Sequence, residues 1–115
     1  MTYEDFMRRP ISERRTKCHE LMTKYPDRVP VIISSRDFKL KKFKYLVHSH
    51  MTVGQLFYYL RRNAVTLGED EAMFVLVNDH TLPSITHTVS DLYHEYKDPL
   101  DGFLYLTLSA ESTFG

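Results

Sequence analysis

The chain ends in residues whose chemistry is specific enough to suggest a function. The segment Ser109 to Gly115 is small and polar apart from Phe114 and follows an apolar run, so we expect a flexible tail with no core to bury. Gly115 has no Cβ, and its carbonyl can therefore be approached closely by a phosphate, a thiol or an amine. Gly115 is thus a candidate acyl group, although a glycine at this position, taken alone, is weak evidence.

Residues that could act as nucleophiles or metal ligands are few and poorly spaced. Cys18 lies on the expected apolar face of a helix, where a structural thiol is more frequent than a nucleophile. The six histidines lack zincin or zinc-finger spacing, and His48 and His50 would share a strand face with only adventitious metal binding. The sequence has no G-x-S-x-G, P-loop or dinucleotide-binding glycine pattern. We expect no catalytic residues, no metal and no cofactor: the chain is not an enzyme.

Composition indicates one domain with an uneven distribution of charge. The 115 residues contain a single cysteine and no long apolar run or signal pattern, which favours the cytoplasm. Residues 1–62 hold 14 of the 15 Lys and Arg against 6 acids, whereas residues 63–115 hold 1 Lys against 9 acids. A basic face for acidic peptides, anionic lipid or nucleic acid is one interpretation; attraction within the fold is the other. A pI near neutrality argues against a nucleic-acid binder, so we expect no nucleic acid.

Two helices are expected before the first strand. A helix beginning near Ser12, a good N-cap residue, is predicted by apolar residues at i, i+3, i+4 and i+7, namely Cys18, Leu21, Met22 and Tyr25. It must stop before Pro26, which cannot continue a helix. Thr2 to Arg9 is a shorter candidate that Pro10 breaks, with Tyr3 and Phe6 as its main anchors. So short a helix must dock in order to persist.

The remaining elements alternate between strands and helices. Val29 to Ser34 and Lys44 to His50 read as a hairpin, and Pro30 places the first of these strands at or near a sheet margin. Alternation puts Lys44, Leu46 and His48 on one face of the second strand, and Tyr45 and Val47 on the other. A helix then starts at a capping box, Thr52 and Gln55. Strands at Met73 to Val77 and Phe103 to Ser109 flank a short helix at Ser90 to Tyr96.

This order of elements predicts an α+β fold. Four strands in a mixed sheet over a central helix form the ubiquitin-like β-grasp, here with two additional N-terminal helices. We divide the chain into an N-terminal helical extension at residues 1–25, a ubiquitin-like domain at residues 26–110 and a flexible C-terminal tail at residues 111–115.

Seven short blocks run through nearly the whole chain. They are Lys24-Tyr25-Pro26-Asp27-Arg28-Val29-Pro30-Val31-Ile32, Lys44-Tyr45-Leu46-Val47, Thr52-Val53-Gly54-Gln55, Phe74-Val75-Leu76-Val77-Asn78, Asp91-Leu92-Tyr93, Phe103-Leu104-Tyr105 and Phe114-Gly115. In order and spacing these blocks resemble the autophagy ubiquitin-like modifiers, the family that contains GABARAP. The differences are a shorter segment between Ser35 and Lys41 and a few single-residue insertions.

The resemblance implies a conjugation reaction at Gly115. In this family the glycine is activated as an adenylate, passed through enzyme thioesters and joined to the amine of phosphatidylethanolamine. The implied partners are ubiquitin-like activating and conjugating enzymes and a cysteine protease for deconjugation, with Phe114 and Phe74 in their recognition surface. Two acyl chains anchor a protein stably, so the product would reside on autophagosomal membranes. Since relatives often carry residues beyond the glycine, a chain ending at Gly115 is expected to be matured or to need no trimming.

The resemblance also implies a surface for cargo receptors that carry aromatic-x-x-aliphatic motifs. Such a peptide would add as a strand beside the hairpin and place two side chains in pockets. The pocket for the aromatic residue would consist of Leu21, Pro30, Ile32, Lys44, Leu46 and Phe103. The pocket for the aliphatic residue would consist of Tyr45, Val47, Met51, Leu56 and Tyr59. The alternative is that these are core residues, and a pocket wall can serve both purposes.

Charged residues at the rim of this surface would steer acidic peptides. Arg28, Lys42 and Lys44 would face the acids that precede the motif, with binding in the micromolar range, about 8 kcal/mol. Three positions depart from the family pattern and bear on partner preference. Lys17 stands where relatives often have an acid, Asn63 replaces a basic residue and Leu76 replaces an aromatic one.

A second function is compatible with the same fold. An unconjugated trafficking or microtubule-associated adaptor would bind receptors or tubulin through the basic N-terminal helices. Both interpretations expect a monomer in solution, and replacement of Gly115 by Ala separates them, because only the modifier depends on that residue for its membrane localisation.

Overall fold

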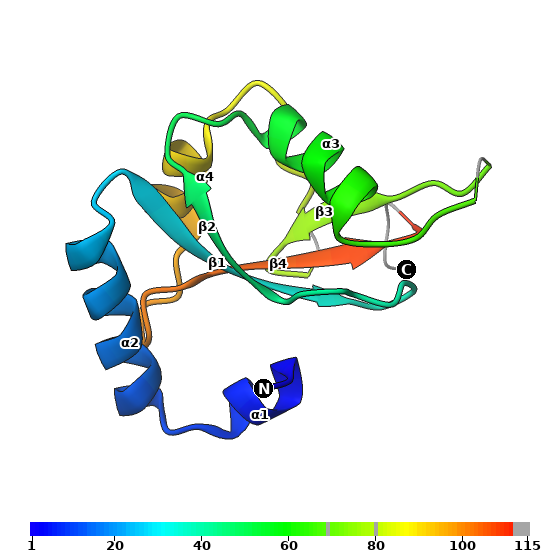
Figure 1. Cartoon of the computed structure of the whole chain (residues 1–115). Helices are drawn as coiled ribbons and strands as arrows, with labels where there is room; N and C mark the ends of the chain where they lie inside the picture. Colours follow the sequence, from blue (N-terminus) through cyan, green and yellow to red (C-terminus); the bar gives the residue numbers. More distant parts are fainter. Residues whose placement is uncertain (69, 80, 112–115) are drawn as a thin grey trace.

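The described residues form four helices and four strands, in the order that the sequence predicts. The computed structural model describes residues 1–68, 70–79 and 81–111 (Figure 1). The elements are α1 (Tyr3–Arg8), α2 (Ile11–Lys24), β1 (Arg28–Ser35), β2 (Lys44–His48), α3 (Val53–Asn63), β3 (Phe74–Val77), α4 (Val89–Tyr96) and β4 (Leu104–Ser109). The predicted α+β architecture, with two helices ahead of a ubiquitin-like unit, is confirmed.

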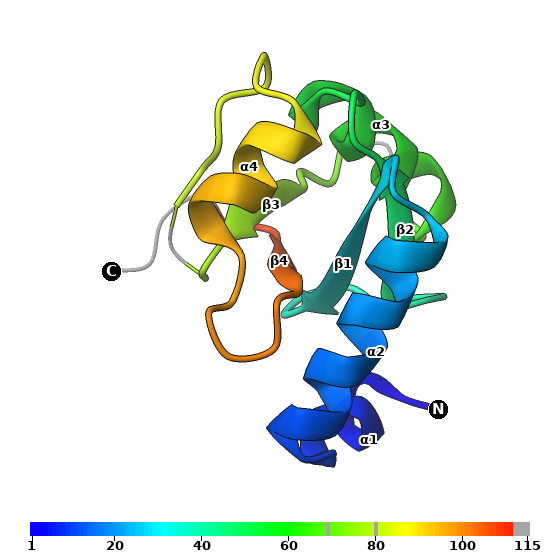
Figure 2. The same ribbon diagram turned by 90° about the vertical axis from the view of Figure 1, so that its left-hand side faces the viewer.

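The four strands form one mixed sheet in the order β2-β1-β4-β3. β1 pairs with β2 as an antiparallel hairpin and with β4 in parallel, and β3 pairs antiparallel with β4. In Figure 1, α3 and α4 lie on one side of this sheet and α1 and α2 on the other, which Figure 2 shows from a second direction. The sheet therefore has two covered faces and two outer strands, β2 and β3.

The larger core lies between the sheet and the helices α3 and α4. Alternate strand residues point into it, among them Val31, Val47 and Leu106, and Leu56 and Leu60 of α3 pack against them. The start of α3 is fixed as predicted, because the Thr52 hydroxyl accepts from the Gln55 N–H while the Gln55 side chain accepts from the Thr52 N–H.

A smaller apolar cluster lies on the opposite face, under α1 and α2. Its buried members are Phe6, Cys18, Ile32 and Phe103. Phe6 comes from α1, whose start is fixed by a capping box between Thr2 and Asp5. A six-residue helix is marginal by itself, so burial of Phe6 is what holds α1 against the sheet.

One expectation about local structure was wrong, and a second was confirmed in its weaker form. Ser12 is the second residue of α2 and not its cap; the cap is Pro10, whose carbonyl accepts from the Glu13 and Arg14 N–H groups. β1 lies near the sheet margin, next to the outer strand β2, and not at the margin itself. Pro30 is tolerated there because pairing between β1 and β4 begins only at Val31, so no β4 residue needs the missing N–H.

Candidate functional site

The outer edge of β2 presents backbone groups that no neighbouring strand of the described sheet takes up. Pro30 lacks an N–H, so its pair with Leu46 must be one of the antiparallel pairs that exchange no hydrogen bonds. Flanking bonds from Ile33 N–H to the Phe43 carbonyl, 2.7 Å, and from Ser49 N–H to the Asp27 carbonyl, 3.0 Å, fit the same alternation. The backbone groups directed away from β1 are therefore those of Lys44, Leu46 and His48.

Arg28 lies across this edge. Its Nη1 atom donates to the Leu46 carbonyl at 3.3 Å, and the side chain is half-buried. A carbonyl oxygen has two lone pairs, so the contact leaves room for a second donor. The predicted position of Arg28 at the rim of the peptide surface is thus compatible with where the structure places its guanidinium group, beside the backbone that a peptide strand would pair with.

The predicted pocket for an aromatic residue is assembled, and Phe6 packs against its floor. Ile32 and Phe103 are fully buried, Pro30 is buried, and Leu21, Lys44 and Leu46 are half-buried. The ring of Phe6 packs edge-on to Phe103 with centroids 5.3 Å apart, and it lies 5.8 Å from Phe43. An aromatic side chain of the protein itself thus covers part of the surface that was predicted to receive a peptide side chain. Sequence reasoning named Phe6 as an anchor of α1 and missed this second role.

Arg14 ties α1 to the body of the domain. Its Nη1 atom donates to the carbonyls of Met7, at 3.1 Å, and Arg9, at 2.6 Å, where α1 ends. Its Nε atom lies 3.1 Å from Asp101, whose side chain is 1% exposed. Asp101 also accepts from the Tyr105 hydroxyl, and burial together with this bond raises the pKa of Tyr105. Arg14 therefore connects the end of α1 to Asp101, which lies in the loop before β4.

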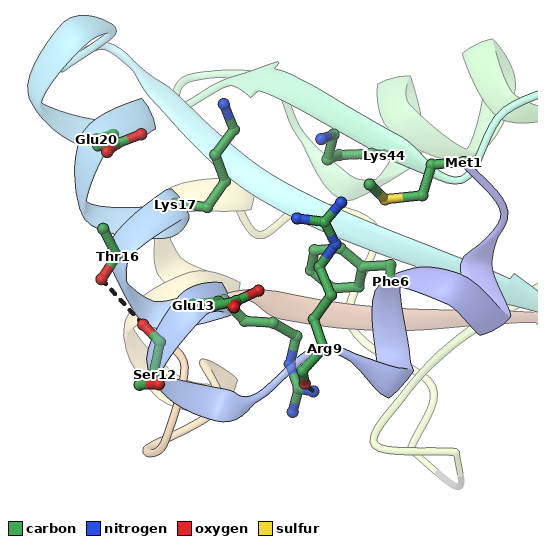
Figure 3. A pocket seen from close by; sticks show the side chains of 10 residues that line it. Met1, Phe6, Arg9, Ser12, Glu13, Thr16, Lys17, Glu20 and Lys44 are labelled. Atoms are coloured by element: carbon green, nitrogen blue, oxygen red, sulfur yellow. Dashed lines mark hydrogen bonds between the residues drawn. The ribbon is translucent and has the colours of Figure 1, made fainter.

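A cavity of about 570 Å³ opens beside Phe6, between α1, α2 and β2 (Figure 3). Arg9, Lys17 and Lys44 extend their charged groups toward it, and Glu13 and Glu20 lie along its α2 side. Burial first, and then the nearby charges of Lys17, Arg9 and Lys42, lower the pKa of Lys44 from its ordinary value. The cations around Lys44 are thus incompletely compensated, and the cavity favours an anionic group.

The predicted pocket for an aliphatic residue forms part of the main core. Tyr45, Val47 and Leu56 are 8%, 6% and 1% exposed, Met51 is partly buried, and the Tyr59 ring stands edge-on to that of Tyr45 at 6.5 Å. The structure therefore brings all five residues together, with Tyr59 as the exposed member. Lys42 Nζ lies 5.0 Å above the Tyr45 ring, so this rim cation contacts a residue of the predicted aliphatic pocket.

A shallow hollow of about 880 Å³ continues outward from Tyr59 over the exposed side of α3. Asn63, one of the departures from the family pattern, lies in its wall and donates from Nδ2 to the Tyr59 carbonyl at 3.0 Å. Tyr58 and Arg62 also line it, with the Arg62 guanidinium 5.6 Å from the Tyr58 ring. At the position where the family pattern has a basic residue, this protein thus has the amide of Asn63, which is hydrogen-bonded within α3.

Phe74, one of the two residues expected to be recognised by conjugation enzymes, lies beside the end of β4. Phe74 is half-buried and pairs with Ser109, the last residue of β4, so it adjoins the start of the tail. Leu76, on the same strand, is fully buried and cannot itself contact a partner in this conformation. Phe114 and Gly115 lie outside the described residues, so their predicted roles rest on the sequence.

The described parts of the chain were also searched for metal sites and membrane spans. Residues 1–68, 70–79 and 81–111 contain no group of three His, Cys, Asp or Glu side chains that could hold a metal ion. Within the same ranges no helix has both the length and the apolar character needed to cross a bilayer.

Comparison with known proteins identifies the family. The model of the family described as autophagy protein Atg8, ubiquitin-like, matches residues 13–115. Autophagy-related protein 8a of Arabidopsis thaliana is 43% identical over 110 residues, covering 92% of this chain and 88% of that protein. Autophagy-related protein 8 of Dictyostelium discoideum is 37% identical over the same share of each chain. The crystal structure of ATG8 from Trypanosoma brucei superposes with a TM-score of 0.82 at 35% identity over all of both chains. The chain therefore belongs to the Atg8 family of ubiquitin-like autophagy proteins.

Proposed function

We propose that this protein is a ubiquitin-like modifier that becomes joined through Gly115 to phosphatidylethanolamine and recruits partners that carry aromatic-x-x-aliphatic motifs. The proposal has two parts, conjugation at the tail and peptide docking along β2. It places a cytoplasmic pool and a lipid-bound pool on autophagosomal membranes, with the conjugated form displaying the docking surface.

The docking part is carried by the open edge of β2. Backbone groups of Lys44, Leu46 and His48 are directed outward, so an extended peptide can add to the sheet by main-chain hydrogen bonds. The apolar floor formed by Ile32 and Phe103 lies on the adjacent face, and the cationic cavity at Lys44 suits acids that precede an aromatic residue.

Docking of an aromatic side chain requires that Phe6 leave its place. Because α1 is short and is held mainly by Phe6 and by Arg14, its release costs far less than unfolding of the domain, whose main core does not include Phe6. The peptide affinity is therefore the intrinsic affinity reduced by the fraction of molecules in which α1 is released.

The conjugation part is supported by family membership and by the tail. The family match extends to residue 115, and a glycine carbonyl is open to the successive attack that the reaction needs. In the first step the carboxylate of Gly115 attacks the α-phosphate of ATP and expels pyrophosphate. An enzyme thiolate then displaces AMP, and the lipid amine finally displaces the thiol to form an amide.

Reconstitution with purified components tests the conjugation part. The chain is incubated with the family's activating and conjugating enzymes, ATP and vesicles that contain phosphatidylethanolamine, and the product is examined by mass spectrometry. We expect a lipid adduct on Gly115 that is absent from the Gly115→Ala variant. No adduct, under conditions in which a known family member is lipidated, would overturn this part of the proposal.

A second candidate function is favoured by the exposed cations of the N-terminal helices. Arg8, Arg9, Arg15 and Lys24 are all exposed, which suits an unconjugated adaptor for an acidic partner such as tubulin. Unchanged membrane localisation of the Gly115→Ala variant in cells would favour this adaptor, whereas dispersal of the variant into the cytoplasm would favour the modifier.

A further inference from the structure

The first residues of the tail are fixed by a side chain from the loop between β1 and β2. Oδ2 of Asp37 accepts a hydrogen bond from the Ala110 N–H at 2.6 Å and another from the Ser109 hydroxyl at 3.3 Å. The Ser109 oxygen in turn accepts from the Glu111 N–H at 3.1 Å. One carboxylate thus holds, directly or through one hydroxyl, the last residue of β4 and the two residues that follow it.

The position of Asp37 is itself determined by the neighbouring backbone. The parallel pairing of β1 with β4 ends at Ser35 and Leu108, and the Arg36 N–H extends it by a bond to the Leu108 carbonyl at 3.0 Å. The Ser35 hydroxyl accepts from the Phe38 N–H at 2.9 Å, which closes the turn that carries Asp37. The turn and the end of β4 lie together at one end of the sheet (Figure 1).

This contact lies in the segment between Ser35 and Lys41, where the sequence is shorter than the family pattern. Asp37 is exposed, whereas Ser109 is 2% exposed and is paired with Phe74 on β3. The carboxylate therefore reaches from the surface to the edge of the core, and it caps a strand end that would otherwise be free to fray.

We propose that Asp37 is a positioning residue for conjugation, which anchors the start of the tail and so sets the point from which Gly115 is presented. The inference rests on the proposed function of Gly115. Beyond the anchor at Ala110, five residues can extend at most roughly 18 Å, so an anchored start limits the reach of the Gly115 carbonyl to roughly that distance from Ala110. An enzyme that binds the tail then orders fewer residues than it would with a frayed strand end.

Amide exchange in the free protein tests the anchor without any enzyme. The exchange rates of the Ala110 and Glu111 N–H groups are measured by NMR in the wild type and in Asp37→Ala, Asp37→Asn and Lys39→Ala. We expect at least a tenfold faster exchange of the Ala110 N–H in Asp37→Ala, and a smaller change in Asp37→Asn, whose amide oxygen can still accept. Lys39→Ala alters an exposed side chain of the same loop and should leave both rates unchanged. Unchanged exchange in Asp37→Ala would overturn the anchor.

Steady-state transfer of Gly115 to the activating enzyme tests the consequence for the reaction. Asp37 does not take part in the reaction at the Gly115 carbonyl. Asp37→Ala should therefore raise the KM of the activating enzyme for this protein about three- to tenfold and leave kcat unchanged. Asp37→Asn should recover most of the loss, which a general effect of the altered loop would not produce. An unchanged KM in a variant whose Ala110 exchange is faster would overturn the positioning role.

The two arms separate failure of this inference from failure of the proposed function. If the wild type forms no adduct, the proposed function fails and the positioning role fails with it, while the exchange rates still decide whether Asp37 anchors the tail. If the wild type is conjugated and Asp37→Ala behaves identically in both arms, the proposed function stands and the inference alone is overturned.

Discussion

The ring of Phe6 stands edge-on to that of Phe103, with centroids 5.3 Å apart and planes at 88°. The first residue belongs to the six-residue helix α1 and the second immediately precedes β4, so the contact joins the first helix to the last strand. Aromatic pairs in this arrangement are favourable beyond the area they bury. In the docking that we propose, the aromatic side chain of the peptide takes over this contact with Phe103, so Phe6 competes with it.

Phe6→Ala should therefore strengthen peptide binding. Removing the internal competitor raises the fraction of molecules with an accessible pocket, and we expect the Kd of an acidic Trp-x-x-Leu peptide to fall by about tenfold, measured by fluorescence anisotropy. Met7→Ala, an exposed neighbour on the same helix, should bind as the wild type does. Weaker binding by a folded Phe6→Ala protein would show that the ring is a wall of the pocket and not its occupant.

Lys17→Glu should weaken binding of the same peptide. Lys17 lines the cationic cavity with Arg9 and Lys44, so charge reversal removes attraction for the acidic flank, and we expect Kd to rise about three- to tenfold at low salt. The pKa of Lys44 should rise at the same time, since Lys17 is one of the charges that lower it, and NMR titration of the lysine side chains measures this.

The matched control for Lys17 is Lys24→Glu on the last turn of α2, where the amino group lies 5.5 Å above the Tyr25 ring. It makes the same change in net charge away from the cavity. Equal weakening by the two variants would mean that long-range attraction, and not the cavity, recognises the acidic flank.

Leu46→Ala tests the β2 face more cleanly than a variant that also replaces Tyr45. Tyr45 is 8% exposed and belongs to the main core, so its removal would lower the stability of the whole domain. Leu46 is half-buried on the outer face. Loss of its contact with a bound peptide should cost roughly 2 kcal/mol, about thirtyfold in Kd by calorimetry. An unaltered Kd would place the peptide on another surface.

Local patterns predicted most elements because they act over a few residues. The capping box at Thr52 and Gln55 and the helix end before Pro26 follow from neighbouring backbone groups, and the structure confirms both. The buried core residues Val47 and Leu56 follow in the same way from strand and helix periodicity. The two predicted peptide pockets combine residues from elements that are distant in the sequence. Periodicity alone does not bring such residues together, and the family resemblance was needed to group them.

What the sequence did not predict depends on contacts between distant segments. The inner position of β1 is set by its parallel pairing with β4, which a proline near the strand start does not reveal. The docking of α1 beside the predicted peptide pocket involves Arg14 and Asp101, which are 87 residues apart. The one local signal was the i, i+3 pair of Tyr3 and Phe6, which indicated that α1 must dock but not where.

Tyr93→Phe should flatten the alkaline part of the stability curve. The Tyr93 hydroxyl donates to the Gly102 carbonyl at 2.7 Å, and burial, followed by the nearby Cys18, raises its pKa from 10.0 to about 12. A raised pKa means that the unfolded state releases its proton first. The stabilisation is therefore fully present below pH 10 and is lost as the pH rises through 12.

The measurement is the free energy of unfolding in urea at intervals from pH 8 to pH 11, for the wild type, Tyr93→Phe and Tyr58→Phe. We expect the wild type and Tyr58→Phe, whose ring is 60% exposed, to lose stability along the same alkaline slope. Tyr93→Phe should be less stable at pH 8, because the bond to Gly102 is gone, yet should lose less as the pH rises. A slope should persist in Tyr93→Phe, because burial also raises the pKa of Cys18 from 9.0 to about 11 and raises the pKa values of Tyr45 and Tyr105. Identical slopes in Tyr93→Phe and the wild type would mean that the hydroxyl ionises in the folded protein as easily as in the unfolded chain.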